Sequence, residues 1–338
     1  MEKYYAQMSR NGDYVVTAGP DNLNLFWGEK IVWSKQMPES YGEVGGIGNN
    51  GTVLTRKGRE VMLHHISREL EALSGFVPER KGAPPTETGK ISMNEMGTAL
   101  CVELIGHSED EDEGIARSLL KSFSRKKITI KHRLVIFDLD SGGGREVWSF
   151  QRDGASDTSF LWDISPEFKY LMLAETAYPE KSQGSRITRL YLINLEDDRT
   201  EAQLTLSSIV PMSIRINEKL MCLLEIQEEG MRQLLIISPK GDKQFIRPPS
   251  RDNELIFYGN DLIIFRLLQE QVLLFKDFSD KLLYIIDESL LKAFSLQYPL
   301  LFRRNGDILM LFIDGEKMHL KKAVYSWKSS VMDYLYLK

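Results

Sequence analysis

A short polar turn runs directly into an apolar strand at Asn49-Asn50-Gly51-Thr52-Val53-Leu54. Asn and Gly suit such a turn because they tolerate the positive φ that a tight hairpin requires. The same step recurs along the whole chain, with further turns at residues 9–12, 94–97, 165–168, 217–218, 259–261 and 303–306. The repeat predicts a series of β-hairpins.

The spacing of these turns identifies the repeating unit. Between positions 12, 51, 97, 168, 218, 260 and 306 the intervals are 39, 46, 71, 50, 42 and 46 residues. Most of them are close to the repeat of roughly 40 to 50 residues that marks the blades of a propeller. The third interval is longer because it contains an insertion.

Each unit then supplies a third strand and usually a fourth. In the unit with the insertion, residues 134–138 are a third strand, and residues 146–150 are a fourth strand after a Gly-rich turn at 140–144. A four-stranded sheet cannot bury both of its faces alone, whereas sheets stacked in a ring bury both. We therefore expect an all-β fold, with residues 1–338 forming a single seven-bladed β-propeller of four-stranded antiparallel blades; six or eight blades remain open.

The repeat resembles the β-propeller superfamily over nearly the whole chain. Residues 138–148 resemble the Asp-x-x-Gly…Trp ending of pyrroloquinoline-quinone-type repeats, and the step from polar turn to apolar strand resembles WD-repeat propellers of the cytoplasm. The Trp-Asp pair that ends third strands in WD repeats is missing, since Trp162-Asp163 lies at the start of a blade. The resemblance implies a fold and carries over no functional residue.

Composition narrows the classes of protein. Hydrophobic residues make up 42% and charged residues 27% of 338 residues, which is typical of a folded globular protein. The net charge of -5 argues against a protein that grips nucleic acid by charge, so no nucleic acid is expected as a partner. We see no secretory signal and no apolar stretch of membrane-spanning length, and therefore expect no membrane insertion.

The two cysteines give no sign of a disulfide framework. Cys101 and Cys222 each lie inside an apolar run, which is typical of small buried residues in strands. A cytoplasmic, reducing compartment is the expectation that follows.

Two motifs that suggest chemistry fail the test of their context. Residues 46–53 match Gly-x-Gly-x-x-Gly-x-Val, but a strand follows where a dinucleotide site needs a helix, so we interpret the loop as a hairpin turn. The histidines show no zinc-ligand spacing, and no Gly-x-Ser-x-Gly elbow is present. The sequence thus predicts no catalytic residue, no metal site and no cofactor.

Four long segments, at residues 78–88, 106–131, 151–158 and 178–186, distinguish one part of the repeat. Two join consecutive blades and two join a second strand to a third, so all four should emerge on the same face, from blades two to four. In the third blade, residues 106–131 form an inserted acidic and amphipathic loop. Within it Ile115, Leu119 and Phe123 recur every four residues, which predicts a short helix with one apolar stripe.

We expect a non-enzymatic scaffold that binds a protein or peptide partner on this face. The sequence leaves the oligomeric state open. The candidate contacts are chosen from loop position and are Arg80, Lys81, Ile115, Leu119, Phe123, Arg125, Lys126 and Lys127.

The alternative is an enzyme or small-ligand binder that uses the central channel, where propeller enzymes place polar groups of their inner strands. The channel candidates are Asp163, Arg215 and Arg303.

Overall fold

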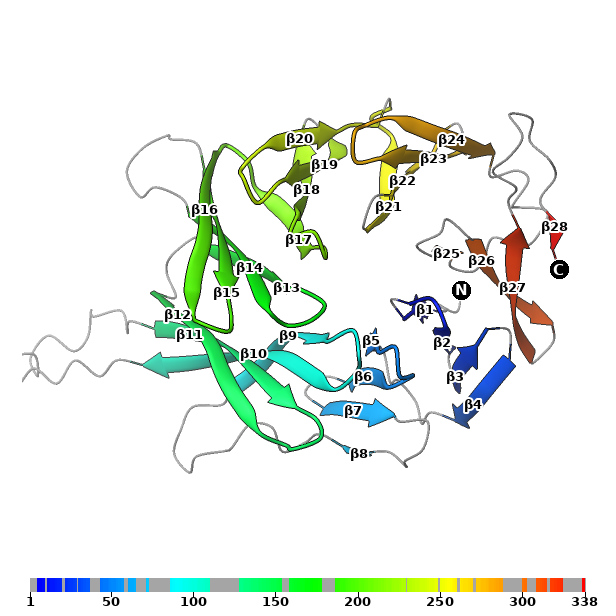
Figure 1. Ribbon diagram of the computed structural model, residues 1–338, viewed down its shortest axis with the longest axis horizontal. Helices are drawn as coiled ribbons and strands as arrows, with labels where there is room; N and C mark the ends of the chain where they lie inside the picture. The colour runs from blue at the N-terminus through cyan, green and yellow to red at the C-terminus, as the bar shows by residue number, and fades with distance from the viewer. Residues whose placement is uncertain are drawn as a thin grey trace, which may run out of the picture.

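The computed structural model of this chain is built from β-strands arranged around a ring (Figure 1). It describes residues 5–9, 11–19, 22–28, 30–36, 43–57, 60–64, 71–72, 86–109, 128–153, 158–177, 186–228, 230–248, 250–259, 262–269, 272–287, 300–302, 308–314, 317–324 and 336–337. Within these ranges no residue is helical, and the strands form seven four-stranded antiparallel sheets.

Every sheet uses four strands that are consecutive in the chain. The first three sheets comprise β1 (Tyr5–Met8), β2 (Tyr14–Ala18), β3 (Asn22–Trp27) and β4 (Lys30–Gln36); β5 (Glu43–Ile47), β6 (Val53–Lys57), β7 (Glu60–His64) and β8 (Glu71–Ala72); and β9 (Thr86–Met93), β10 (Ala99–Glu109), β11 (Ile128–Asp138) and β12 (Gly144–Asp153).

The remaining sheets continue the pattern. They comprise β13 (Ser159–Ile164), β14 (Tyr170–Ala177), β15 (Ile187–Asn194) and β16 (Arg199–Ser207); β17 (Pro211–Ile216), β18 (Cys222–Glu228), β19 (Met231–Ile237) and β20 (Lys243–Ile246); β21 (Asn253–Gly259), β22 (Leu262–Leu267), β23 (Val272–Asp277) and β24 (Leu282–Asp287); and β25 (Leu300–Phe302), β26 (Ile308–Asp314), β27 (Lys317–Val324) and β28 (Tyr336–Leu337).

The sheets stand side by side like the blades of a propeller, with their first strands toward the axis (Figure 1). β1 lies beside β5, β5 beside β9, and β13 beside β17, so neighbouring blades meet at their inner strands. β25 lies beside β1, which brings the last sheet against the first and closes the ring. The predicted all-β propeller of four-stranded antiparallel blades is confirmed.

The hydrophobic core lies in the seams between blades. Alternate side chains of a strand point to opposite faces of its sheet, and both faces here are apolar. Leu171 and Leu173 of β14 join one buried cluster with Cys101 of the preceding blade. Met172 and Ala174 of the same strand join a second cluster with the following blade. Each described blade interior is therefore buried only because a neighbour covers it.

The turns between first and second strands adopt the positive φ that the sequence predicted. It occurs at Gly12 (φ 78°), Gly51 (φ 78°) and Gly97 (φ 75°). The same place in the next two blades is taken by Phe168 (φ 56°) and Leu220 (φ 56°), so the backbone shape is kept where the residue type is not. Leu220 follows the turn predicted at residues 217–218, and the structure places it in that turn, before β18 begins at Cys222.

Hydrogen bonds connect these turns from blade to blade. Asn11 donates its backbone N–H to Oδ1 of Asn49 at 3.0 Å, and Asn49 donates its own backbone N–H to the carbonyl of Glu95 at 2.7 Å. Glu95 in turn donates to the carbonyl of Pro166 at 3.0 Å. Four successive turns are thus tied together on one face, which we call the turn face.

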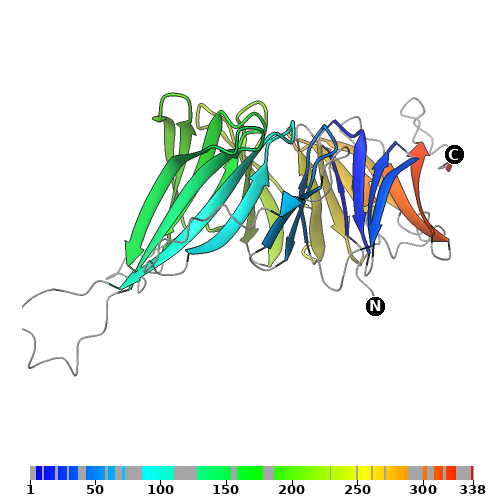
Figure 2. The same cartoon turned by 90° about the horizontal axis from the view of Figure 1, so that it is seen from below.

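The insertion predicted over residues 106–131 is shorter than expected. Residues 106–109 belong to β10 and residues 128–131 belong to β11, where Glu109 and Ile128 still face each other in register. The predicted helix falls on residues 110–127, which lie outside the described residues. With eleven residues each, β10 and β11 extend beyond their neighbours on one face (Figure 2).

Replacing Gly97 tests the tight packing of the turn face. Its φ is positive, and a Cβ there would lie 2.3 Å from Oδ1 of Asn50 in the neighbouring blade. We expect Gly97→Ala to lower the free energy of unfolding, measured by urea denaturation, by about 3 kcal/mol, since αL strain and a steric clash add.

Gly142→Ala is the matched control. Gly142 also has a positive φ, but a Cβ there would meet no atom within 4 Å. Only the strain of about 1–2 kcal/mol should remain. Equal losses in the two variants would contradict the role given to contacts between the turns.

Candidate functional site

The strand order places the four long connections on the same face of the ring. They join β8 to β9, β10 to β11, β12 to β13 and β14 to β15. Because strands alternate in direction, these ends all lie opposite the turn face, and we call this side the long-loop face. Their predicted limits are corrected at the first connection, since Thr86 already begins β9, and at the third, since β12 runs to Asp153.

Glu103 of β10 is the polar centre of the seam between the β9–β12 and β13–β16 blades. Its Oε1 lies 2.8 Å from Nδ1 of His132, and its Oε2 accepts the indole N–H of Trp162 at 3.2 Å. Oε2 also accepts the backbone N–H of Lys90 at 3.1 Å, which a β-bulge in β9 has freed from the ladder. One carboxylate therefore joins two strands of its own blade to the next blade.

The hydrogen bonds at Glu103 outweigh its burial. Burial by itself raises the pKa of a carboxyl group. The hydrogen bonds from His132, the Lys90 N–H and Trp162 together lower the pKa of Glu103 by more than burial raises it, so this pKa lies below its ordinary value of 4.5. The carboxylate is ionised at neutral pH. His132 is 9% exposed, and its Nε2 has no hydrogen-bond partner in the described structure.

Lys90 and Asp163 brace the inner end of the same seam. The Lys90 ammonium lies over the Trp162 ring at 4.6 Å from the centroid, donates to the Trp162 carbonyl, and lies 3.2 Å from Oδ1 of Asp163. The other oxygen of Asp163 accepts the backbone N–H of Ile216 at 3.1 Å. Both carboxylate oxygens are thus used to connect three successive blades.

Aromatic side chains fill the seam toward the long-loop face. Phe160 of β13 lies 4.0 Å from Phe150 of β12 and 5.8 Å from Trp148, measured between ring centroids, and His132 lies 5.9 Å from Phe160. Trp148, Phe150 and Phe160 are partly buried. We call these four residues the aromatic seam; it combines rigid rings with remaining exposed surface, a property of recognition sites.

Three polar side chains of the β13–β16 blade, Glu175, Arg189 and Tyr191, contact one another in the same seam. Oε2 of Glu175 accepts a hydrogen bond from the Tyr191 hydroxyl at 3.2 Å and lies 3.7 Å from Nη1 of Arg189. Burial and the Glu175 charge raise the pKa of Tyr191, so its hydroxyl stays a donor. The Arg189 side chain is 47% exposed and the Glu175 side chain 19%, which leaves the cation facing solvent.

The structure does not bring together the site residues predicted from the sequence. The eight partner contacts, Arg80, Lys81, Ile115, Leu119, Phe123, Arg125, Lys126 and Lys127, lie outside the described residues, as does Arg303 of the channel set. Of the other two channel candidates, Asp163 makes the contacts between blades described above, and Arg215 is exposed on β17. Within the described ranges, no cluster of three His, Cys, Asp or Glu side chains could hold a metal ion.

Sequence reasoning missed Glu103, His132 and the aromatic seam. His132 and Phe150 face each other in the ladder of β11 and β12, but Trp162 meets Glu103 across 59 residues. Alternation along β12, with Trp148 and Phe150 two residues apart, was the available signal for a shared aromatic face.

No described helix is long and apolar enough to cross a membrane.

Comparisons with known proteins show the fold. No family model matches the sequence, and no curated protein matches it. The chain is similar to the β-propeller domain of Cps50 (Swd1) from Myceliophteria thermophila, with a TM-score of 0.50 and 9% identity over 93% of this chain and 94% of that one.

Two further solved structures align with this chain at lower TM-scores. A puromycin-hydrolyzing peptidase of Mycobacterium tuberculosis gives a TM-score of 0.49 and 12% identity over 92% of this chain and 50% of that one. The BBS1N chain crystallised in complex with ARL6DN gives 0.47 and 12% over 94% and 90%. The ring of four-stranded antiparallel sheets and the similarity to the Cps50 domain show that the chain is a β-propeller.

Removing the Glu103 charge tests whether it holds the seam. At about pH 7, Glu103→Gln should lower the free energy of unfolding by about 2 kcal/mol, the scale of hydrogen bonds to a charged group. Because the folded pKa is below the ordinary 4.5, this stability is present above that value and is lost as the pH falls through the folded pKa. Urea midpoints of wild type and variant should therefore converge as the pH is lowered from about 7 to below 4.5.

Glu201→Gln is the control, because Glu201 pairs at 3.1 Å with an Arg199 side chain that is 69% exposed. Its effect should stay below about 0.5 kcal/mol. A constant difference in urea midpoint between wild type and Glu103→Gln across the pH range would contradict the conclusion that the ionised carboxylate of Glu103 stabilises the seam.

Proposed function

We propose that this protein is a non-enzymatic docking platform that binds a protein partner on its long-loop face, over the β9–β12 and β13–β16 blades. The carrying observation is the aromatic seam, because it lies between the strand ends from which three of the four long connections leave. Binding residues gather on loops that a rigid scaffold positions, and this face combines the two.

The chemistry at the seam favours a protein over a polyanion. The partly buried carboxylates of Glu103 and Glu175 already contact His132 and Arg189, so the surface carries partnered carboxylates next to partly exposed rings. Aromatic residues and Arg are enriched at protein interfaces, whereas nucleic-acid surfaces need an excess of unpaired cations. Mixed signs steer and orient a protein partner.

One channel candidate, Asp163, supports this proposal by the contacts that it already makes. Asp163 uses both carboxylate oxygens to connect blades, through Lys90 and the Ile216 N–H. A general acid or base needs an oxygen that faces substrate, whereas both oxygens of Asp163 contact neighbouring blades.

The thiols of Cys101 and Cys222 are free and buried, and burial raises the pKa of each. They support the cytoplasmic location that we propose.

Replacing residues 110–127 is the direct test. Glu109 and Ile128 are register partners, so a Gly-Ser turn of about four residues closes the β10–β11 hairpin without moving the strands. Proteins captured from a lysate of the source cells by the intact chain identify a partner, whose affinity is then measured with purified components. We expect the replacement to weaken that affinity at least about tenfold.

The matched control changes the turn face. Glu167→Ala with Lys169→Ala removes an exposed ion pair in the turn between β13 and β14. This variant should bind like the intact chain. A partner that is lost with the turn-face variant, or that binds all three proteins equally, would overturn the proposal.

A further inference from the structure

The two cationic residue types are separated between the two faces of the β13–β16, β17–β20 and β21–β24 blades. First and third strands begin at the long-loop face, where second and fourth strands end. Six arginines in the described part of these blades lie near those strand ends: Arg186, Arg189, Arg232, Arg247, Arg251 and Arg266. All six lysines among the same described residues lie near the turn face: Lys169, Lys219, Lys240, Lys243, Lys276 and Lys281.

Arginine and lysine suit different anions. The guanidinium is a planar fork that donates two parallel N–H groups to the two oxygens of one carboxylate, whereas the lysine ammonium is a compact point charge on a flexible chain. Arginine is also enriched at protein interfaces, where lysine is depleted. A face on which the described cations of three blades are arginines is therefore suited to binding a planar anion.

Partly buried carboxylates orient two of these arginines toward solvent. Nη1 of Arg189 lies 3.7 Å from Oε2 of Glu175, and Nη1 of Arg232 donates to Oε1 of Glu225 at 3.4 Å. The Arg232 side chain is 42% exposed and the Glu225 side chain 13%, so the carboxylate is the more buried partner, as it is in the Arg189 pair. Each contact engages one nitrogen of a group that has five N–H donors. The pairs thus hold the guanidinium groups in place and leave donors for a ligand.

A buried amide positions Arg247 in the same way. Gln233 is 1% exposed, accepts the Nε–H of Arg247 at 2.9 Å, and donates to Oε2 of Glu228 at 2.9 Å. The same Glu228 oxygen accepts a hydrogen bond from Nη2 of Arg247 at 3.3 Å, and the guanidinium carbon lies 5.3 Å from the centroid of the Phe245 ring. No contact among the described residues uses Nη1, so one edge of this half-exposed guanidinium is open.

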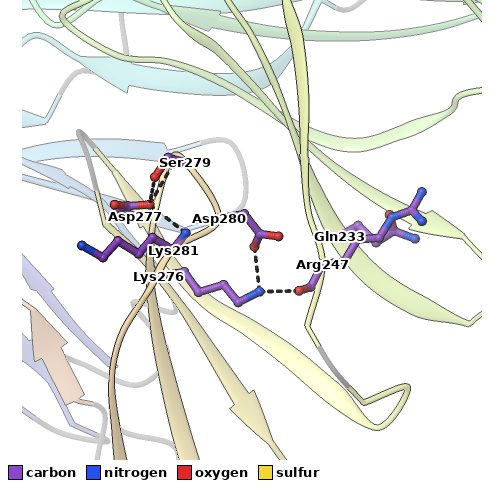
Figure 3. Close-up of polar contacts among 7 residues, drawn as sticks. All are labelled: Gln233, Arg247, Lys276, Asp277, Ser279, Asp280 and Lys281. Atoms are coloured by element: carbon purple, nitrogen blue, oxygen red, sulfur yellow. Dashed lines mark hydrogen bonds and ion pairs between the residues drawn. The ribbon is translucent and has the colours of Figure 1, made fainter.

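Lys276, the lysine beside this arginine, is used inside the protein (Figure 3). Its side chain is only 12% exposed, and its ammonium donates to Oδ1 of Asp280 and to the carbonyl of Arg247, both at 2.7 Å. Figure 3 shows the Arg247 side chain extending away from Lys276, toward Gln233. The lysine charge therefore joins two blades, while the arginine charge faces solvent.

We infer that the long-loop face of these three blades binds an extended acidic segment of a protein partner, whose carboxylates lie against Arg189, Arg232 and Arg247. The inference rests on the proposed function, because it states the chemistry by which that partner binds. Neighbouring sheets pack about 10 Å apart and ten extended residues span about 33 Å, so one segment can cross three blades.

The same surface is poorly suited to a chain of phosphates. Each of these three arginines already contacts a carboxylate of its own blade, and the whole chain has a net charge of -5. A phosphate backbone is bound by a surplus of cations, whereas separate carboxylates can each bind one guanidinium. The mixed signs of this surface also orient a protein partner.

Fluorescence anisotropy of a labelled decaglutamate peptide, titrated with the purified full chain, measures this binding. At low ionic strength we expect saturable binding. The double variant Arg189→Lys with Arg232→Lys should weaken it at least about tenfold, since each charge is kept but each fork is lost.

Arg199→Lys is the matched control, because Arg199 begins β16 at the turn face, pairs with Glu201 and is 69% exposed. This variant should bind decaglutamate like wild type. An absence of saturable binding to the wild-type chain, or equal binding by wild type, control and double variant, would overturn the inference.

A single-stranded DNA of ten nucleotides is the competing probe, since it carries a similar negative charge on phosphates. We expect it to bind more weakly than decaglutamate, because the arginines are already partnered by carboxylates. DNA that binds as tightly as decaglutamate, or more tightly, would contradict the assignment to an acidic protein segment.

The partner captured in the docking experiment separates this inference from the proposed function. A partner that is weakened by replacing residues 110–127, but not by the double arginine variant, would leave the docking platform in place and overturn the acidic segment. A partner that is weakened by the arginine variant, but not by the replacement, would support the acidic segment and count against the proposed platform.

Discussion

Each blade of this protein has two apolar faces and no means of covering either by itself. Leu171 and Met172 are neighbours on β14, yet they belong to buried clusters that lie on opposite sides of their sheet. The free energy of burial is therefore gained only when blades are stacked, and it is complete only when β25 reaches β1. Every other feature of the molecule is arranged around this requirement.

The two faces of the ring meet that requirement differently. On the turn face, short hydrogen-bonded turns touch from blade to blade, and the approach of Gly48 to Gly97 leaves no room for a Cβ. A face packed in this way tolerates little change in length. On the long-loop face, connections leave from strand ends, where added residues need not disturb the seams. The insertion between β10 and β11 lies on the side where the architecture permits it.

Much of the fold was predictable because its determinants are local. Asn-Gly turns and alternating strands are legible in the sequence, and Leu134-Val135-Ile136-Phe137 became the interior of β11 as predicted. Phe168 and Leu220 show the limit, since nothing in either residue type announces a positive φ. The site was out of reach for another reason: Trp162 reaches Glu103 only after two blades have packed.

The central claim is that partner recognition belongs to the long-loop face and not to the turn face. Photo-crosslinking from two positions of one blade tests it most directly: Arg189, half-exposed near the aromatic seam, and Glu167, exposed in the turn before β14. With a photoreactive residue at each position in turn, the account predicts that the partner is crosslinked from position 189 and not from position 167. Crosslinking from position 167 alone, or from both positions equally, would contradict it.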